Sequence, residues 1–548
     1  MTASLSFLTA ALGLGILSLP GVVSAQATQV ASDESPKEMA QKIQSLLDQV
    51  NELRRRLDAQ SSVSLQTKSA ADMAAAEAAS AKERAAALPS QIHSEAQSQV
   101  SAAKAISDKF YYKGVTITLG GFLAAESIYR QHDQANDIST SFATIPYANN
   151  SVGQTQELRF TARQSRVSAL VQGSPGPQTH LGFYSEFDFQ GAAQTANSNE
   201  SNSYTPRLRH MYGTIDWDDL GLHLLVGQAW SLVTLNSQGI TPRNEVPPPT
   251  IDGQYIPGFT WTRQPQIRLV QDLPHAVSIA VSLENPQTTF FTGVNPLPST
   301  VHLTFNAPAG QGFDSANTLS LNHIPDVVWK IVYEPIVADR HLHLEAYYLY
   351  RSFYERLNFN NQNSSGGGVG GALTVQVVPQ LLDFQVSALA GKGIGRYGSA
   401  QLTDVTFDPA GNIHPIHEIE ALAGLTLHVT NKLDYYLFFG EEKESAEAFN
   451  LSNPAGTVTP YGYGNPLYQN GGCFSEVPTV PPTACIGNSR LIKQGTTGFW
   501  FKPYAGTFGR FQYGLQYSYS QRKSFEGLGG AATANQSIVM ASMRYYPF

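Results

Sequence analysis

The sequence predicts an all-β transmembrane barrel of about 16 antiparallel strands, preceded by an N-terminal α-helical coiled coil. Charged residues make up only 14% of the 548 residues while aromatic residues reach 10%, which suits a large apolar exterior. Beyond the N-terminal signal, no stretch is long and apolar enough for a membrane helix, so a spanning chain must cross with strands. Segments with two-residue periodicity follow one another from Lys113 to the C-terminus, as barrel strands require.

Residues 1–25 have the features of a secretory signal peptide. An apolar stretch from Leu5 to Leu19 is followed by Pro20, and Val23-Ser24-Ala25 supplies small residues for cleavage. The alternative, a membrane anchor helix, is disfavoured because the apolar stretch is short.

Residues 26–58 are predicted to form a periplasmic coiled coil. Apolar residues recur there at alternating spacings of four and three, which is the heptad pattern. The seam residues are Met39, Ile43, Leu46, Val50, Leu53 and Leu57. A dimer or a trimer would satisfy this seam, and a single amphipathic helix packed on the barrel is the alternative. Residues 59–112, rich in Ala, Ser and Gln, are expected to be a partly helical periplasmic linker.

Residues 113–548 are predicted to form the barrel. The expected strands are 114–129, 157–172, 179–190, 204–216, 220–229, 265–273, 276–284, 326–335, 340–351, 368–378, 381–391, 415–429, 432–440, 491–503, 507–520 and 535–548. Short links rich in Pro, Gly, Asn and Asp alternate with long ones, including 352–367 and 441–490. Short turns belong on the periplasmic side and long loops on the outside, and the barrel is expected in the bacterial outer membrane, in contact with its lipid.

Aromatic residues near strand ends are expected to form girdles at the membrane interfaces. These residues are Tyr435, Tyr436, Phe438, Phe439, Tyr545 and Tyr546. The terminal Phe548, which closes an aromatic strand, resembles the C-terminal signal of outer-membrane proteins, so the barrel assembly machinery is an expected partner.

The chain has two cysteines, Cys473 and Cys485, in one Gly/Pro-rich segment. In an exported chain this pair predicts one disulfide that closes a loop, with two free thiols as the alternative. A net charge of −8 makes nucleic acid an unsuitable partner.

In order and arrangement, the chain resembles the DcaP-like outer-membrane porins. The matching stretches are Gly120-Gly121-Phe122, Thr161 to Arg166, Glu186 to Phe189, Arg207 to His210 with Tyr212-Gly213, Val226 to Trp230, and Arg263 to Arg268. The resemblance is tightest over residues 110–275 and implies a homotrimer of 16-stranded barrels with periplasmic coiled coils that takes up small anions such as dicarboxylates. The Gly/Pro-rich loop with the cysteine pair departs from the family.

Arginines gather in the second, fourth and sixth predicted strands, and we expect them to line the pore. They are Arg159, Arg163, Arg166, Arg207, Arg209, Arg263 and Arg268. An arginine facing lipid near the midplane would cost about 2–4 kcal/mol, whereas the guanidinium fork suits carboxylates. The strand phase slips between Arg163 and Arg166, which predicts a β-bulge. The alternative is a structural ladder in which these arginines pair with Glu157, Glu186 and Asp188.

The third long loop, 230–264, is expected to fold into the barrel and narrow it, because its prolines restrict its freedom. Glu245, Pro249, Asp252 and Tyr255 are the candidate constriction residues, and Arg243 is an added anion contact. The alternative is an exposed cap.

These patterns favour a porin for passive diffusion of small hydrophilic solutes, with a preference for anions. The alternatives are a selective channel for neutral nutrients such as sugars, or an outer-membrane barrel enzyme or adhesin. No catalytic residue, cofactor or metal site is expected, since His341 and His343 lack further ligands nearby.

Overall fold

The computed structural model describes residues 109–192, 205–307, 310–311, 318–478 and 481–548, together with single residues between Gln41 and Arg55. The chain divides into two units, Met1–Ala103 and Lys104–Phe548. In the first unit Val50 is helical and about half exposed. The other seam residues and the signal peptide lie outside the described residues, so the coiled coil stays a prediction. Among the described residues, no helix has the length and apolar character needed to cross a membrane.

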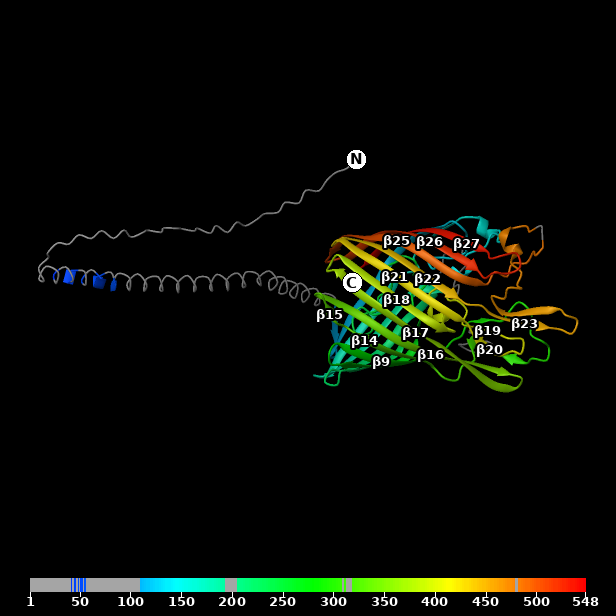
Figure 1. Cartoon of the computed structure of the whole chain (residues 1–548), viewed down its shortest axis with the longest axis horizontal. Coiled ribbons are helices and arrows are strands. Elements are labelled where there is room, and N and C mark those ends of the chain that lie inside the picture. Colours follow the sequence, from blue (N-terminus) through cyan, green and yellow to red (C-terminus); the bar gives the residue numbers. More distant parts are fainter. Residues whose placement is uncertain are drawn as a thin grey trace, which may run out of the picture. The chain divides into compact units, whose positions relative to one another are not determined.

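In the second unit, the described residues form a closed antiparallel barrel of 16 strands (Figure 1). Each strand pairs with the next along the barrel wall, and β27 pairs back onto β2, with Leu123 opposite Tyr545. The wall strands are β2 (Val115–Arg130), β3 with β4 (Glu157–Thr161 and Arg166–Gly176), β5 (Thr179–Gly191), β6 (Thr205–Trp217), β7 (Leu222–Trp230), β8 (Arg263–Leu273), β9 (Val277–Glu284), β14 (Asp326–Tyr333), β16 (Arg340–Leu357), β17 (Asn360–Val378), β18 (Leu382–Lys392), β21 (His417–Thr430), β22 (Leu433–Glu444), β25 (Ser489–Gly506), β26 (Gly509–Ser524) and β27 (Thr533–Tyr546).

Each of these wall strands overlaps one predicted segment. The predicted long link at 352–367 is wrong, however, because β16 and β17 continue through it and meet at a tight turn at Asn358 and Phe359. Both turn residues have positive φ, as two-residue hairpin turns require. The β17 half of this hairpin, residues 360–367, contains only polar residues and glycine, so it lacks the alternation that predicts the other strands.

Along the wall strands, the outward positions are mostly apolar, and most of the polar side chains face the lumen. On β26, Tyr513, Leu515 and Tyr517 are exposed, whereas Gln516 and Ser518 are buried. An apolar outer band around a polar interior is the arrangement of a membrane-spanning barrel.

The predicted aromatic girdle is only partly correct. Tyr435 and Phe439 face outward, but Tyr436 and Phe438 are fully buried inside the barrel. Because strand side chains alternate between faces, neighbouring residues such as Tyr435 and Tyr436 cannot both reach lipid. The inward pair packs against the third long loop instead.

The second wall strand is interrupted where the phase slip predicted a bulge. On β2, Glu126 lies opposite Thr161 and Phe122 lies opposite Arg166. The partner strand has one residue more between these two positions than β2 has, so the interruption acts as a β-bulge. It returns Arg166 to the lumen-facing side, on which Phe122 and Glu126 are buried.

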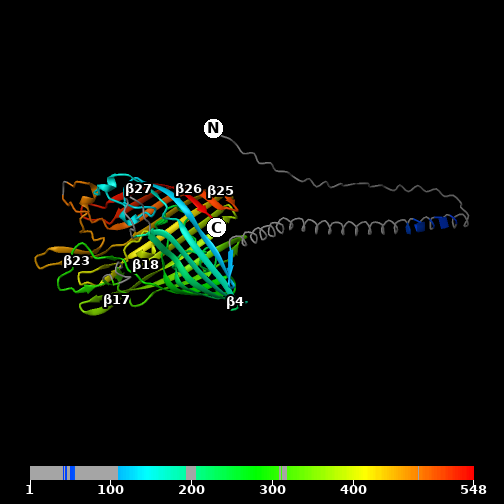
Figure 2. The same ribbon diagram turned by 180° about the vertical axis from the view of Figure 1, so that it is seen from behind.

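The long connections lie at one end of the barrel, with β19 (Val405–Phe407), β20 (Ile413–Pro415) and β23 (Glu447–Ser452), and the C-terminus lies at the other end (Figures 1 and 2). Between β24 (Val458–Tyr463) and β25, Cys473 and Cys485 are joined by a disulfide. At the end with the short turns, β1 (Lys109–Tyr112), which falls within the stretch expected to be linker, pairs with β2.

Candidate constriction site

The long loop between β7 and β8, Ser231–Thr262, runs through the barrel lumen. At its start, the Leu232 N–H donates to Glu284 on β9 at 2.8 Å. Further along, the Ile251 N–H donates to the Gln516 Oε1 on β26 at 2.6 Å. These two strands are the seventh and the fifteenth of the 16 in the wall, so they stand on opposite sides. The loop therefore crosses the lumen and does not cap it.

Carboxylates of the wall hold the loop by accepting its backbone N–H groups. The Glu345 Oε1 accepts from Asn236 at 2.9 Å, and the Glu442 Oε1 accepts from Gly258 at 2.6 Å. Gly258 has a φ of +83°, and an added Cβ would lie 2.0 Å from the Ala421 carbonyl oxygen. Only glycine fits at this contact, where the loop lies directly against β21.

Apolar contacts complete the attachment of the loop. Ile251, Ile256 and Phe259 are fully buried against wall residues that include Tyr436 and Phe438. This packing explains why both aromatic residues face inward.

The predicted constriction residues have different roles. Asp252 accepts hydrogen bonds from the N–H and Oγ1 of Thr140 at 3.1 and 2.6 Å, so it fastens the loop to the first long connection. Burial raises the pKa of Asp252. The Pro249 carbonyl accepts from the Trp500 Nε1 at 2.8 Å, and the Glu245 carboxylate accepts from the Arg243 N–H at 2.8 Å.

Tyr255 lies against the arginines of the wall. Its neighbours Arg166, Arg209 and Arg263 come from β4, β6 and β8. Burial acts to raise the pKa of Tyr255, but the positive charges of Arg209, Arg166 and Arg263 outweigh it and lower the pKa to about 8. The loop thus meets a cluster of positive charge where it crosses the lumen.

Some of the predicted arginines are held by acids or by backbone carbonyls. Arg207 donates to Asp188 at 2.6 and 3.0 Å, and Arg209 pairs with Glu186 and Asp188. Arg159 forms an ion pair with Glu157. Arg163 forms an ion pair with Asp137 and donates to the Phe189 and Gly191 carbonyls. Arg268 donates to the Gln266 side chain and to the Trp230 carbonyl. Arg207 and Arg209 thus belong to a structural ladder of arginines paired with acids on the barrel wall.

Arg263 and Arg166 keep free donors. Within the described part of the chain the Arg263 side chain makes no hydrogen bond or ion pair, and its Nη1 is buried without a partner. Its guanidinium lies 4.6 Å from the Trp230 ring centre. The Arg166 Nε also lacks a partner among these residues, and its one ion pair, with Glu186, is long at 3.8 Å. Unmet buried donors are costly unless a solute or water satisfies them.

Two parts of the site were missed from the sequence. Arg544 on β27 joins the cluster, with Nη2 bonds to Glu126 at 3.1 Å and to Gln164 at 2.7 Å. On the other wall, four buried carboxylates stand on β21 and β22: Glu418, Glu420, Glu442 and Glu444. Their spacing of two along each strand was the available signal, since it places each pair on one face.

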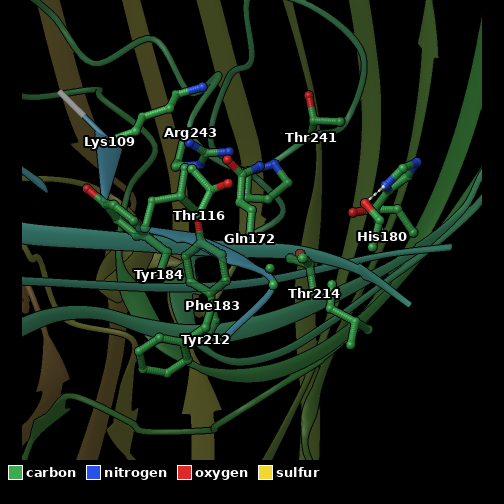
Figure 3. Close-up of a pocket in the computed structure, with 18 residues that line it drawn as sticks. Lys109, Thr116, Gln172, His180, Phe183, Tyr184, Tyr212, Thr214, Thr241 and Arg243 are labelled. Carbon is green, nitrogen blue, oxygen red and sulfur yellow. Dashed lines mark hydrogen bonds between the residues drawn. The ribbon is translucent and has the colours of Figure 1, made fainter. Parts of the chain in front are cut away.

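A cavity of about 480 Å³ lies between the crossing loop and the short-turn end of the barrel (Figure 3). It is lined by residues of β1, β2, β4, β5 and β6 and by the loop residues Thr241, Pro242 and Arg243. Lys109, Gln172, Tyr184 and Arg243 are among the residues around it.

A closed barrel with an apolar exterior and a lumen crossed by a loop defines a channel-type membrane barrel. No protein-family model matches the chain, and neither does any curated protein. Among solved structures it is similar to the outer membrane channel DcaP of Acinetobacter baumannii, with a TM-score of 0.54 and 18% identity over 80% of this chain and 99% of that chain. This likeness shows a shared fold and confirms the resemblance drawn from the sequence.

The comparison also returns more distant barrels. An anion-selective porin from Comamonas acidovorans aligns with a TM-score of 0.41 and 11% identity, over 79% of this chain and 99% of that chain. Pseudomonas putida OprB aligns with a TM-score of 0.42 and 10% identity, over 78% and 94%.

Raising the pH through about 8 is expected to reduce any anion preference of the channel. Tyr255 is neutral below this pH and a phenolate above it, so a negative charge then appears beside Arg166, Arg209 and Arg263. Reversal potentials in a salt gradient should be measured about one pH unit below and about one pH unit above this pKa. At the higher pH they should be shifted toward cation selectivity, by roughly the amount expected for the loss of one arginine. The Tyr255→Phe variant should lack this shift, and an equal shift in that variant would contradict the assignment.

Gly258→Ala should detach the crossing loop from the wall. The added methyl meets the Ala421 carbonyl, and overpacking of this kind costs about 1–3 kcal/mol. Single-channel conductance is expected to rise as the loop moves, while heat-modifiable mobility on gels reports an intact barrel. Gly239→Ala is the matched control, since Gly239 also has positive φ but nothing lies within 4 Å of its added Cβ. Equal conductance of the two variants would contradict the role of this contact.

Proposed function

We propose that this chain is an outer-membrane porin through which small hydrophilic solutes diffuse passively, with a preference for anions such as dicarboxylates. The observation that carries the proposal is the pair Arg166 and Arg263, whose unmet donors lie where the loop residue Tyr255 meets the wall. A guanidinium with free N–H groups can bind a carboxylate through two parallel hydrogen bonds.

The exposure of the charged groups also supports an anion preference. Arg159 and Arg207 keep 49% and 33% of their side-chain surface exposed on the lumen-facing side of their strands. The four carboxylates on β21 and β22 are at most 2% exposed, and Glu442 and Glu444 accept N–H groups from loops that cover them. These two arginines are therefore more accessible to a passing solute than these four carboxylates, and rings of charged side chains select solutes by charge.

Reversal potentials in planar bilayers test the proposal. The wild-type channel should favour chloride over potassium, and Arg263→Gln should reduce that preference because it removes an unpaired positive charge at the constriction. Arg356→Gln is the matched control, since Arg356 is exposed on the β16–β17 hairpin and bonds only Asn361 among the described residues. A cation-selective wild-type channel would overturn the proposal.

We further propose that the porin is a homotrimer held in part by the periplasmic coiled coil. The heptad pattern of residues 26–58 supports this, because a short seam gains from being tethered to an oligomeric base. Deletion of residues 36–58 should lower the temperature at which the oligomer dissociates on gels. An oligomer of unchanged stability would show that the barrel walls suffice.

A further inference from the structure

We infer that the cavity beside the crossing loop is a binding site for a sugar acid, which is a monosaccharide-sized carboxylate that carries several hydroxyl groups. This binding site lies on the side of the constriction that faces the short turns. The inference rests on the proposed diffusion function and names a substrate class for it. The cavity of about 480 Å³ has the size of known small-molecule sites.

One row of lumen-facing positions runs across four strands of the cavity wall. Thr116 on β2 lies opposite Gln172 on β4, Gln172 lies opposite Gly182 on β5, and Gly182 lies opposite Thr214 on β6. Gly182 has no side chain, and the Thr214 Oγ1 lies 2.5 Å from the place that a Cβ would take, so the Thr214 side chain lies over this position. The Thr116 and Thr214 hydroxyls and the Gln172 amide of this row line the cavity, which suits the hydroxyl groups of a sugar.

Arg243 supplies the positive charge above this row (Figure 3). It is exposed, and within the described residues its guanidinium makes no hydrogen bond or ion pair, although it lies 5.8 Å from the Tyr184 ring centre. Its backbone has a φ of +73°, a left-handed conformation that is unfavourable for a residue with a side chain. Such strain is typical of functional positions.

Glu245, the carboxylate nearest to Arg243 in the sequence, does not pair with the Arg243 guanidinium. Glu245 instead accepts the backbone N–H of Arg243, and its charge is also within reach of Arg268. Lys109 lines the same cavity and adds a second positive charge, while the Asp216 carboxylate that also lines it is bonded to His223 at 2.7 Å. The donors of Arg243 therefore remain available for the carboxylate of a solute.

Tyr212 gives an independent indication that something polar binds here. Its side chain is 4% exposed and lines the cavity, and its hydroxyl is buried without a partner among the described residues. Arg243 is among the charges that act on this hydroxyl. A buried hydroxyl beside a cavity, with no partner among the described residues, is satisfied by water or by a ligand. The neighbouring Tyr184 ring offers an apolar face against which the C–H groups of a sugar can pack.

Block of the chloride current through single channels by D-gluconate tests the inference, with D-glucose and propionate as comparison solutes. Gluconate should interrupt the current at lower concentration than either, since glucose lacks the carboxylate and propionate lacks the hydroxyls. Arg243→Gln should weaken gluconate block by about tenfold or more, the usual effect of losing a charge-assisted hydrogen bond. Thr214→Val should weaken block by gluconate but not by propionate. The control Arg356→Gln should keep wild-type block.

The outcomes separate the two proposals. Equal block by gluconate and propionate would overturn the sugar-acid assignment, and equal block by gluconate and glucose would overturn the role of Arg243. Reversal potentials are recorded in the same membranes. If the wild-type channel is anion-selective but gluconate does not block it, or if the block survives Arg243→Gln, the sugar-acid binding site alone is refuted. If the wild-type channel is cation-selective, the proposed function is refuted. Heat-modifiable mobility on gels confirms that each variant has folded.

Discussion

The structure depends on the requirement that every backbone N–H and C=O group within a membrane has a partner inside the protein. A sheet meets this requirement only when its two edges join, and here β27 bonds β2. Closure sets the environment of every other side chain in the wall. One face of each strand meets lipid and must be apolar, so the charges and amides of the strands are confined to the lumen.

A loop that enters such a lumen brings backbone N–H groups of its own. The segment Ser231–Thr262 leaves its strands and crosses between opposite walls, where Glu284, Glu345 and Glu442 accept its N–H groups. Carboxylates are strong acceptors for this purpose, because hydrogen bonds to an ionised group are about twice as strong as neutral ones. These acids therefore serve to position the loop, and the contact of Gly258 with Ala421 brings one of its turns directly against the wall.

Much of the barrel could be predicted from the sequence, because alternation along a strand is a local property. The same property located the bulge between Arg163 and Arg166. The contacts that could not be predicted are those that exist only once the barrel has closed. The inward positions of Tyr436 and Phe438 follow from their packing on the crossing loop, and Arg544 reaches Glu126 only because the last strand returns to the first. The β16–β17 hairpin could not be predicted because residues 360–367 contain only polar residues and glycine, although their pairing with β16 continues.

The arginines of the lumen differ in what holds them in place. Arg209 is positioned by Glu186 and Asp188, and these ion pairs occupy the donors that a solute would need. Arg263 lies directly opposite Trp230 in the register of β7 and β8, and its guanidinium stacks on the indole ring. A cation–π contact orients a guanidinium without using its N–H groups, so the side chain is held in place while its donors stay free. Arg243 over Tyr184 repeats this arrangement at the cavity below. Arg263 and Arg243 thus have an aromatic neighbour and no acidic partner among the described residues, which leaves their donors free to bind a solute.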